Sequence, residues 1–595
     1  MVLLVWMYYK MKQNHTGLNR RICTFLIIFC IFGYSKSKAG QASKTYLFRE
    51  GCWGVYSWCS WNPNEVTRKK CPLIKGAPII LHWNKVEPEP GNFRFYEQLG
   101  VRLKLATENE FYTFVMIWVA PNAPRWLYEK GVPELQMTPT IGPLRKPRNW
   151  TFQYYFDEDY KRYYYRLIRE FGRYIRDLPA VLQERILYIQ SAEGSTGDGY
   201  CYKGRPIDEQ YNITREQWTQ FRIRAWEVYK EALTDSNGNM VKPLLVNYDS
   251  NREAEYNCLL ANFDVIGLKN GMFSHGYHIS DTQQRLENWK KFVKDVSESG
   301  KTFFSRGEQD GEWQVCGWSS RNTQQALYWS ALFATHCGLD MWNLPHEACQ
   351  GRTYSAAINL FNKYAGQHDA STAPAAFCAL RKGLDAADTI AYPESTFGNA
   401  RKSNVDRYLQ IAEAFSRYGA IQGDPEKATG GGMKNRQRDN YNDVGWKILP
   451  GNYYRYLEQI DPDQTSIGFW HVRPQASIYS RFARGFDCAN GKVAMYFRLD
   501  PAFFGLINQS NMIKVRIIYL DRGNGQWGLF CNRNNKEEAA YEVRCQNSES
   551  WKEKTVIINQ ALFNGSLERG ADLILKHLGG DDTIFHFIEI ERHRR

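Results

Sequence analysis

The sequence ILYIQSAEGSTGDGY (residues 186–200) decides how this chain is read. A largely apolar run, long enough for one strand, leads to a single carboxylate, Glu193, and a glycine-rich loop follows at once. Strands buried on both faces are typical of α/β folds, and functional groups in such folds lie in the loops at the carboxyl ends of the strands. We therefore expect Glu193 to belong to an active site; a strand-end carboxylate paired with a neighbouring arginine is the structural alternative.

The same pattern of strand and helix repeats along the chain. Seven further apolar runs of strand length occupy residues 54–58, 77–83, 111–120, 242–248, 264–270, 301–306 and 338–344. Helical periodicity of apolar residues occupies residues 160–178, 215–233 and 282–299. Eight strands alternating with helices predict an α/β fold, a (β/α)₈ TIM barrel over residues 45–420 that includes trailing helices after the eighth strand.

The last third of the chain has a different pattern. A polar stretch with three consecutive glycines at 430–432 predicts a linker over residues 421–449. Short strands and turns then fill residues 450–595, which predicts a C-terminal all-β sandwich domain. We expect this domain to brace the barrel, and binding of a ligand of its own is the alternative.

The composition argues against several classes of function. Hydrophobic residues make up 43% and charged residues 23%, as in an ordinary globular protein. The 14 cysteines show no metal-ligand spacing, and we find no phosphate-binding glycine loop and no basic run or finger for nucleic acid. We therefore expect no metal, no organic cofactor and no nucleic-acid partner. Aromatic residues, at 15%, suit a protein that stacks rings against sugars.

Residues 1–39 have the pattern of a secretory signal peptide. Basic residues precede the apolar run ICTFLIIFCIFG, and small residues follow it before Gly40. This run is too short to span a bilayer, so we expect a secreted or periplasmic protein with no membrane span in the mature chain. Removal of these residues lowers the formal net charge from +13 to +7, which is compatible with an anionic partner.

Polar and aromatic side chains gather at the predicted carboxyl ends of the strands, where barrels build their active sites. Two carboxylates, Glu193 after the fourth strand and Glu308 after the seventh, are expected on opposite sides of one mouth. Glycoside cleavage needs such a pair, because one group protonates the leaving oxygen and the other attacks the anomeric carbon or activates water. The residues expected to bind substrate beside them are His82, Trp83, Trp118, Trp126, Asp198, Asn247, Tyr248, Lys269, His275, Tyr277, Arg306, Asp310, Trp313, Trp342 and Asn343.

Two other classes of function stay open. An inverting glycosidase would use a wider pair, such as Glu193 with Asp249 or Asp310. A non-catalytic glycan-binding protein would keep the cleft of the barrel without the reaction.

Two segments carry a resemblance to a known group of enzymes. HWNKVEPEPGNFRFYEQL (82–99) is similar to the segment after the second strand in β-galactosidases of glycoside hydrolase families 42 and 35. VAPNAPRWLYEKGVP (119–133) resembles the Pro-x-Trp-Leu segment after their third strand. The pattern of residues 50–350 thus resembles the clan A retaining (β/α)₈ glycoside hydrolases. The chain as a whole, with SRFARGFD (480–487) in its C-terminal part, is similar to secreted bacterial enzymes that degrade red-algal galactans such as agar, carrageenan and porphyran.

This resemblance implies a β-galactosidic substrate in a polysaccharide or oligosaccharide, with sulfated galactans among the candidates. It also implies roles for the two carboxylates, with Glu193 as general acid/base and Glu308 as nucleophile. The chain departs from the clan in one respect, because Ser191-Ala192 precede Glu193 where most members have an asparagine that binds the sugar 2-hydroxyl. Asn247 or Asp198 is expected to take that contact, unless the substrate differs at that hydroxyl.

Overall fold

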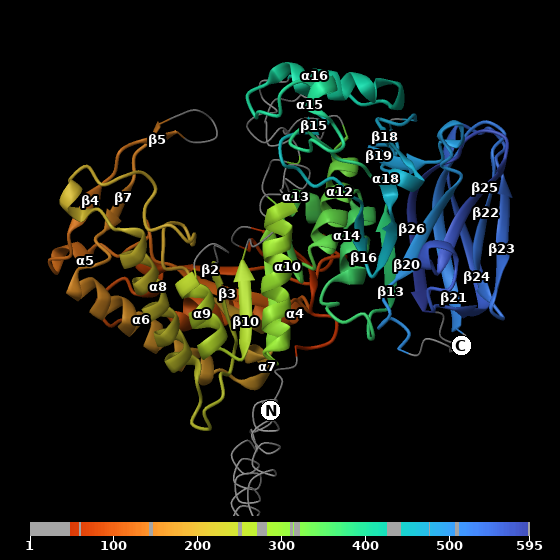
Figure 1. Cartoon of the computed structure of the whole chain (residues 1–595). Coiled ribbons are helices and arrows are strands. Elements are labelled where there is room, and N and C mark those ends of the chain that lie inside the picture. The colour runs from red at the N-terminus through yellow and green to blue at the C-terminus, as the bar shows by residue number, and fades with distance from the viewer. Residues whose placement is uncertain are drawn as a thin grey trace, which may run out of the picture. The chain divides into compact units, whose positions relative to one another are not determined.

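The computed structural model describes residues 48–58, 61–141, 147–247, 253–269, 283–309, 313, 322–424, 442–474, 476–505 and 511–592 (Figure 1). The expected signal peptide lies outside these ranges. Within them, no helix combines the length and the apolar character that crossing a bilayer requires.

Eight parallel strands form the sheet of the N-terminal part, in the order β1-β12-β11-β10-β9-β8-β3-β2. Successive strands of this order pair in parallel register along the whole sheet. This sheet confirms the predicted (β/α)₈ barrel. The strands are β1 Gly54–Ser57, β2 Ile79–His82, β3 Thr113–Trp118, β8 Ile186–Gln190, β9 Leu244–Asn247, β10 Val265–Lys269, β11 Thr302–Glu308 and β12 Met341–Leu344.

The two ends of this sheet meet at Gly76, just before β2. Tyr56 of β1 forms a parallel bridge with Gly76, and Gly76 bridges Tyr112 at the start of β3. The main-chain nitrogen of Ser57 donates to the oxygen of Gly76 at 3.0 Å. A Cβ atom on Gly76 would lie 1.8 Å from the carbonyl oxygen of Tyr112. The ring of strands therefore closes at this point because the residue is a glycine.

Helices alternate with the strands, and their ends are set by local sequence. The side chain of Asp157 accepts from the nitrogen of Tyr160 at the start of α6, and Thr214 with Gln217 forms a capping box that starts α8 at the predicted residue. The helices here are α3 Trp83–Val86, η1 Tyr96–Gly100, α4 Val101–Glu108, α5 Trp126–Glu129, α6 Glu158–Arg176, α7 Ala180–Gln183, η2 Glu209–Tyr211, α8 Arg215–Leu233, α9 Glu253–Asn262, α10 Gln283–Glu298, α12 Thr323–His336, α13 His346–Cys349 and α14 Ser355–Tyr364.

Two short hairpins extend from the loop that follows α5. Strand β4 (Glu134–Gln136) pairs with β7 (Thr151–Gln153), and β5 (Thr140–Ile141) pairs with β6 (Pro147–Arg148).

The interior of the barrel is packed with side chains, so it offers no channel. Except at Leu187 and Tyr188 of β8, these side chains come from alternate positions of the strands, since neighbouring residues of a strand face opposite sides of the sheet. On β12, for example, Met341 lies inside the barrel and Trp342 lies outside, against the helices. The interior cluster includes Tyr56, Ile80, Phe114, Met116, Leu187, Tyr188, Leu245, Phe304 and Met341.

The C-terminal part is all-β, as predicted. Its strands form one hydrogen-bonded sheet of twelve strands around its own apolar core. The ends of the sheet path, β16 and β17, flank Tyr456, which bridges Phe377 of β13, so the sheet returns on itself. The strands are β13 Ala375–Ala379, β16 Tyr453–Arg455, β17 Leu457–Ile460, β18 Ile467–Trp470, β19 Phe482–Gly485, β20 Ala494–Leu499, β21 Asn511–Asp521, β22 Gln526–Arg533, β23 Lys536–Arg544, β24 Ser550–Leu562, β25 Leu573–Gly579 and β26 Ile584–Arg592.

The predicted boundary at residue 450 is wrong, because strand β13 belongs to this sheet. It pairs antiparallel with β26 over its whole length. Part of the expected linker is structured as well, since β15 (Val444–Gly445) pairs with β14 (Leu384–Asp385). Residues 425–441 of that linker lie outside the described residues. The remaining helices are α15 Glu394–Phe397, α16 Val405–Ala414, η5 Ser416–Tyr418, α18 Pro462–Thr465, η7 Cys488–Asn490 and η8 Glu568–Gly570.

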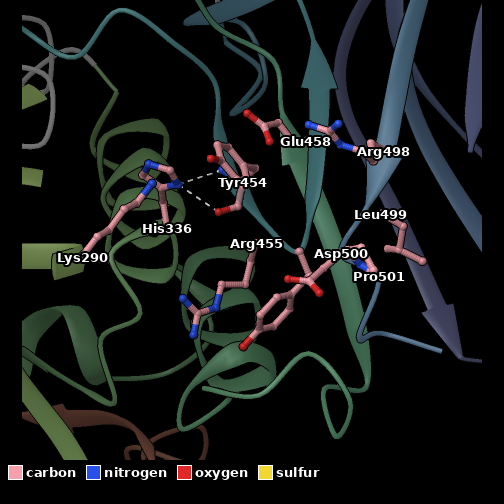
Figure 2. Close-up of a pocket in the computed structure, with 10 residues that line it drawn as sticks. Lys290, His336, Tyr454, Arg455, Glu458, Arg498, Leu499, Asp500 and Pro501 are labelled. Atoms are coloured by element: carbon pink, nitrogen blue, oxygen red, sulfur yellow. Dashed lines mark hydrogen bonds between the residues drawn. The ribbon is translucent and has the colours of Figure 1, made fainter. Parts of the chain in front are cut away.

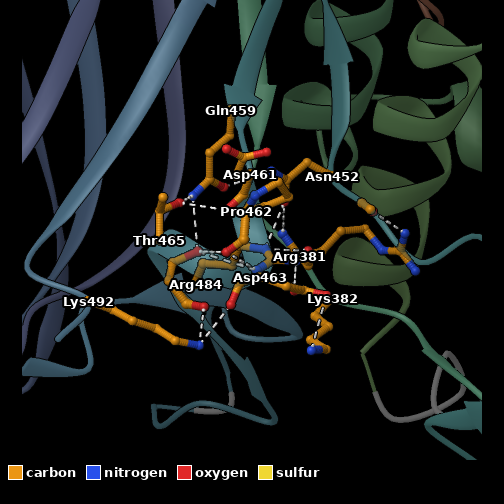
Figure 3. A network of polar contacts seen from close by, with 12 residues as sticks. Arg381, Lys382, Asn452, Gln459, Asp461, Pro462, Asp463, Thr465, Arg484 and Lys492 are labelled. Carbon is orange, nitrogen blue, oxygen red and sulfur yellow. Dashed lines mark hydrogen bonds and ion pairs between the residues drawn. The ribbon is translucent and has the colours of Figure 1, made fainter. Parts of the chain in front are cut away.

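A polar network joins the segment after β13 to β19 and α18 (Figure 3). The guanidinium of Arg484 donates to the main-chain oxygen of Arg381 at 2.8 Å and pairs with Asp463 at 3.0 Å. Lys382 pairs with the same carboxylate at 3.3 Å. These contacts bind the segment after β13 to the C-terminal module, consistent with the early start of that module.

A buried ion pair holds the end of the expected linker in place. The side chain of Asp443 is fully buried and pairs with the equally buried Arg481. Its Oδ2 also accepts from the main-chain nitrogen of Ile421 at 2.8 Å. Burial alone would raise the pKa of Asp443, but the charges of Arg481 and His471 hold it below its ordinary value.

We expect Asp443→Asn to lower the free energy of unfolding by about 3–5 kcal/mol at neutral pH, because it leaves the Arg481 charge buried without its counter-ion. Lys291→Ala removes an exposed pair with Asp295 on α10 and should cost less than about 1 kcal/mol. Urea titrations of both variants measure the difference.

The same urea titrations repeated at acid pH test how the contribution of Asp443 to stability depends on pH. Since folding lowers the pKa of Asp443, its contribution is present above the ordinary value of 3.8 and is lost as the pH falls through the folded value. The gap between wild type and Asp443→Asn should therefore narrow below that pH. A gap that stays constant into acid would contradict this account.

Candidate active site at the barrel mouth

Four charged side chains meet at the carboxyl ends of the barrel strands, and we call them the mouth cluster: Asp198, Lys269, Arg306 and Glu308. Glu308, the last residue of β11, accepts from the guanidinium of Arg306 at 3.1 Å. The ammonium of Lys269, the last residue of β10, lies 3.4 Å from Glu308 and 3.5 Å from Asp198. The sum of these two distances puts a ceiling of about 7 Å on the separation of the two carboxylate oxygens that the ammonium contacts.

Strand register places three members of this cluster. Arg306 and Glu308 are two positions apart on β11, so both point to the inside of the barrel. Lys269 is the register partner of Arg306, and Asn343 of β12 is the register partner of Glu308. The Nε of Arg306 donates to the side chain of Asn343 at 2.8 Å, and its NH1 donates to Gln190 at 3.2 Å. The predicted residues Lys269, Arg306, Glu308 and Asn343 are thus brought together.

The fourth member, Asp198, is held by the loop after β8. Gly197 has a φ of 75°, and a Cβ atom there would lie 2.6 Å from Nε1 of Trp118. The side-chain amide of Asn247 donates to the oxygen of Gly197 at 2.6 Å. Asn247, one of the predicted residues, therefore acts by holding the loop. The side chain of Asp198 is 36% exposed and also lies 3.4 Å from Lys203, so it is accessible from solvent.

An aromatic ring covers the cations of the mouth cluster. The guanidinium carbon of Arg306 lies 4.3 Å from the ring centre of Trp58, and the ammonium of Lys269 lies 5.9 Å from it. Trp58 follows β1, and it was not among the residues predicted to bind substrate. Its position directly after β1 was the available signal. Trp118 and His82, which are register partners on β3 and β2, pack edge to face beside the same mouth.

The prediction that Glu193 faces this mouth is wrong in the structure. Its side chain is fully buried, and its Oε1 accepts from Nε1 of Trp226 at 2.6 Å. Arg222 lies 3.6 Å from its other oxygen. Trp226 and Arg222 belong to α8, so the carboxylate points to the helix layer. Gln190 and Ala192 face the inside, and strand alternation then turns Glu193 outward.

Three tryptophans that were predicted to bind substrate are also placed elsewhere. The side chains of Trp83, Trp126 and Trp342 are buried in the core outside the barrel. Nε1 of Trp83 donates to the Glu87 carboxylate at 2.9 Å, and Nε1 of Trp126 donates to the main-chain oxygen of Glu87 at 3.0 Å. Trp342 packs against the ring of Phe361 on α14. These rings are covered by protein, so they cannot stack on a sugar.

The remaining predicted residues are only partly described. Trp313 is buried, with its ring edge to face with Tyr354. Tyr248, His275, Tyr277 and Asp310 lie outside the described residues, as does Asp249 of the inverting alternative.

A hollow lies between the barrel and the C-terminal strands (Figure 2). Its volume is about 290 Å³, and Lys290, His336, Tyr454, Arg455, Glu458 and Arg498 are among its lining residues. His336 ends α12, which leads to the start of β12, so this hollow lies toward the amino ends of the strands. Burial, with the charge of Lys290, lowers the pKa of His336 to about 3, so its ring is neutral at physiological pH. Barrel enzymes build their sites at the other end.

Comparison with known proteins gives structural matches and no sequence match. No family model matches the chain, and no curated protein matches it. Among solved structures, the catalytic domain of β-amylase from Paenibacillus polymyxa is 11% identical, covers 52% of this chain and 96% of its own, and has a TM-score of 0.33. A β-galactosidase from psychrophilic Marinomonas ef1 is 12% identical over 52% of this chain and 59% of its own, with a TM-score of 0.33. Native xylanase 10B from Thermotoga maritima is 11% identical over 53% and 98%, with a TM-score of 0.31.

We expect Glu193→Ala to lower the free energy of unfolding by about 1–3 kcal/mol, because the buried Nε1–H of Trp226 then loses its acceptor. Arg222 keeps its pair with Glu255 at 2.6 Å, which limits the cost. Glu184→Ala, which breaks an exposed pair with Arg49, should change stability by less than about 1 kcal/mol. Chemical denaturation compares the two, and equal stability of Glu193→Ala and wild type would show that this carboxylate is not structural.

Proposed function

We propose that the barrel mouth hydrolyses glycosidic bonds, with Glu308 and Asp198 as the two carboxylates of the reaction. The observation that carries the proposal is their position. Both lie at the carboxyl ends of barrel strands. Their oxygens are at most about 7 Å apart, which allows the spacing of about 5–5.5 Å that retaining glycosidases use. Asp198 follows the same strand as Glu193. We assign to Asp198 the general acid/base role that the sequence suggested for Glu193.

The two carboxylates have different surroundings, and we assign their roles from this difference. Glu308 is nearly buried, and the guanidinium of Arg306 and the ammonium of Lys269 favour its ionised form. It is therefore the nucleophile. Asp198 is partly exposed to solvent, so a leaving group can depart beside it. It is therefore the general acid in the first step and the general base in the second.

In the proposed reaction, a Glu308 oxygen attacks the anomeric carbon and the bond to the leaving oxygen breaks. That oxygen takes the proton of Asp198, and a covalent glycosyl-enzyme forms. A water molecule then attacks the same carbon, its proton passes to Asp198, and the bond to Glu308 breaks. Two inversions give net retention. The chemistry uses the side chains of the chain and a water molecule.

The cations near Asp198 bear on the substrate. The ammonium groups of Lys269 and Lys203 lie 3.5 and 3.4 Å from the Asp198 carboxylate, so two cations border the proposed acid. An anionic substituent on a sugar bound there would find both cations within reach. We therefore propose a galactan-type polysaccharide or oligosaccharide with β-galactosidic linkages and anionic substituents such as sulfate. The expected signal peptide would place the enzyme outside the cell or in the periplasm.

A non-catalytic glycan-binding protein is the second candidate, and one observation favours it. Lys269 bridges the two carboxylates, and together with Arg306 it makes the mouth cluster neutral overall. In that case an oligosaccharide would bind, measurable by calorimetry, and no new reducing ends would appear.

Reducing-end release from a panel of algal and plant polysaccharides tests the proposal. We expect Glu308→Gln to abolish turnover, and Asp198→Asn to reduce kcat by about 10²–10⁴-fold, the usual contribution of a general acid. Asp208→Asn changes an exposed carboxylate ten residues further along and should leave kcat unchanged. Glu193→Gln should retain activity. Loss of turnover in Glu193→Gln with normal rates in Asp198→Asn would return the acid role to Glu193.

Proton NMR of the first-formed product tests the stereochemistry. We expect the anomer with the configuration of the substrate, because the ceiling on the carboxylate separation excludes most of the range of about 6.5–9.5 Å seen in inverting enzymes. Initial formation of the opposite anomer would show that water attacks directly and would assign Glu308 or Asp198 as its base.

A further inference from the structure

Three side chains with metal-binding chemistry meet at one end of the C-terminal module. Cys488 belongs to η7, His577 to β25, and Asp582 to the turn between β25 and β26. One ligand atom of each lies within 4.8 Å of those of the other two. Thiolate sulfur, imidazole nitrogen and carboxylate oxygen are the three donor types that Zn²⁺ binds in proteins.

The backbone around the three residues fixes their positions. The main-chain nitrogen of Cys488 donates to the Asp582 carboxylate at 3.2 and 3.3 Å. The nitrogen of His577 donates to the oxygen of Val493 at 2.9 Å, and the nitrogen of Phe486 donates to the oxygen of Thr583 at 3.2 Å. The approach of the three side chains is therefore built into strand pairing and does not depend on chance surface rotamers.

The imidazole of His577 gives an independent indication. Its Nδ1 atom is buried and has no hydrogen-bond partner among the described residues. The ring of Phe486 packs edge to face against the imidazole at 5.7 Å between ring centres, which restricts its rotation. Buried polar atoms in folded proteins have partners, and an ion or a water is the usual explanation where the chain supplies none.

Charge and exposure define the kind of site. A Cys488 thiolate and the Asp582 carboxylate together neutralise a divalent cation. Asp582 is exposed, and Cys488 and His577 are half-buried, so an ion can enter from solvent. Three protein ligands leave one tetrahedral position for water, since Zn²⁺ prefers four ligands.

We propose that Cys488, His577 and Asp582 bind one Zn²⁺ ion, with water as the fourth ligand. The ion joins η7 to the turn between β25 and β26, and so reinforces one end of the antiparallel sheet. The site lies outside the barrel and is independent of the proposed hydrolase activity. Sequence analysis predicted no metal site, because the three ligands are separated by up to 94 positions and form no spacing motif.

The test uses the full chain, stripped of metal with a chelator and kept reduced with a phosphine. Calorimetric titration with Zn²⁺ should give one equivalent per chain and raise the Tm. Titration with Co²⁺ should give a thiolate-to-metal charge-transfer band. Cys488→Ser should lose that band, and Cys201→Ser, which changes a half-buried cysteine in the barrel, should keep it.

Asp582→Asn provides the variant that is expected to fold, because its side chain is exposed. It should weaken Zn²⁺ binding at least about tenfold, since a charged ligand becomes neutral. Wild type that binds no Zn²⁺, or Cys488→Ser that binds it as tightly as wild type, would overturn the proposal. A wild type that binds no Zn²⁺ would show that the contact between the Cys488 thiol and the Asp582 carboxylate accounts for the cluster without a metal.

Discussion

The barrel mouth depends on the guanidinium of Arg306. This cation is fully buried, and leaving it unpaired would cost several kcal/mol. It is satisfied by Glu308 on its own strand, by Asn343 on β12 and by Gln190 on β8, with the ring of Trp58 against its face. One side chain thus ties three strands together and fixes the orientation of Glu308. The proposed nucleophile is positioned by the same contacts that close the top of the barrel.

Most of the barrel could be predicted because its strands are short apolar runs separated by amphipathic helices. Helix α8 begins and ends at the residues that its apolar periodicity predicts, and the capping box of Thr214 and Gln217 fixes its start. The early start of the C-terminal module could not be predicted. Strand β13 reads AAFCA, a run of mostly small residues that follows helices, and its pairing with β26 and β16 identifies it as a strand. Long-range pairing of this kind leaves no local signal.

The candidate site was predicted in part for a similar reason. Strand order alone brings Lys269, Arg306, Glu308 and Asn343 together, so their positions followed from the fold. The direction in which the Glu193 side chain points could not be predicted from the fold. Both Leu187 and Tyr188 lie in the interior cluster, and the register between β3 and β8 shifts nearby, so alternation could not be counted from the sequence.

The segment 82–99, on which much of the resemblance rested, has a structural role in this chain. The carboxylate of Glu87 is fully buried, accepts from Gly91 at 2.7 Å and pairs with Arg166 of α6. The Glu87 carboxylate accepts from the indole N–H of Trp83, and the main-chain oxygen of Glu87 accepts from the indole N–H of Trp126. In this chain the motif-like segment therefore serves the packing of a loop.

Helix α12 carries a consequence for how the molecule can be divided. It is buried from Gln325 to His336, although a helix on the outside of a barrel ordinarily keeps one face in water. Its outer face packs on the C-terminal strands, with Trp329 against Phe482 and Tyr328 bonded to His586 at 3.1 Å. A barrel fragment that ended before β13 would expose this apolar face to water. The barrel and the C-terminal sheet therefore need to be expressed together, and a shorter version of this chain needs a redesigned α12 surface.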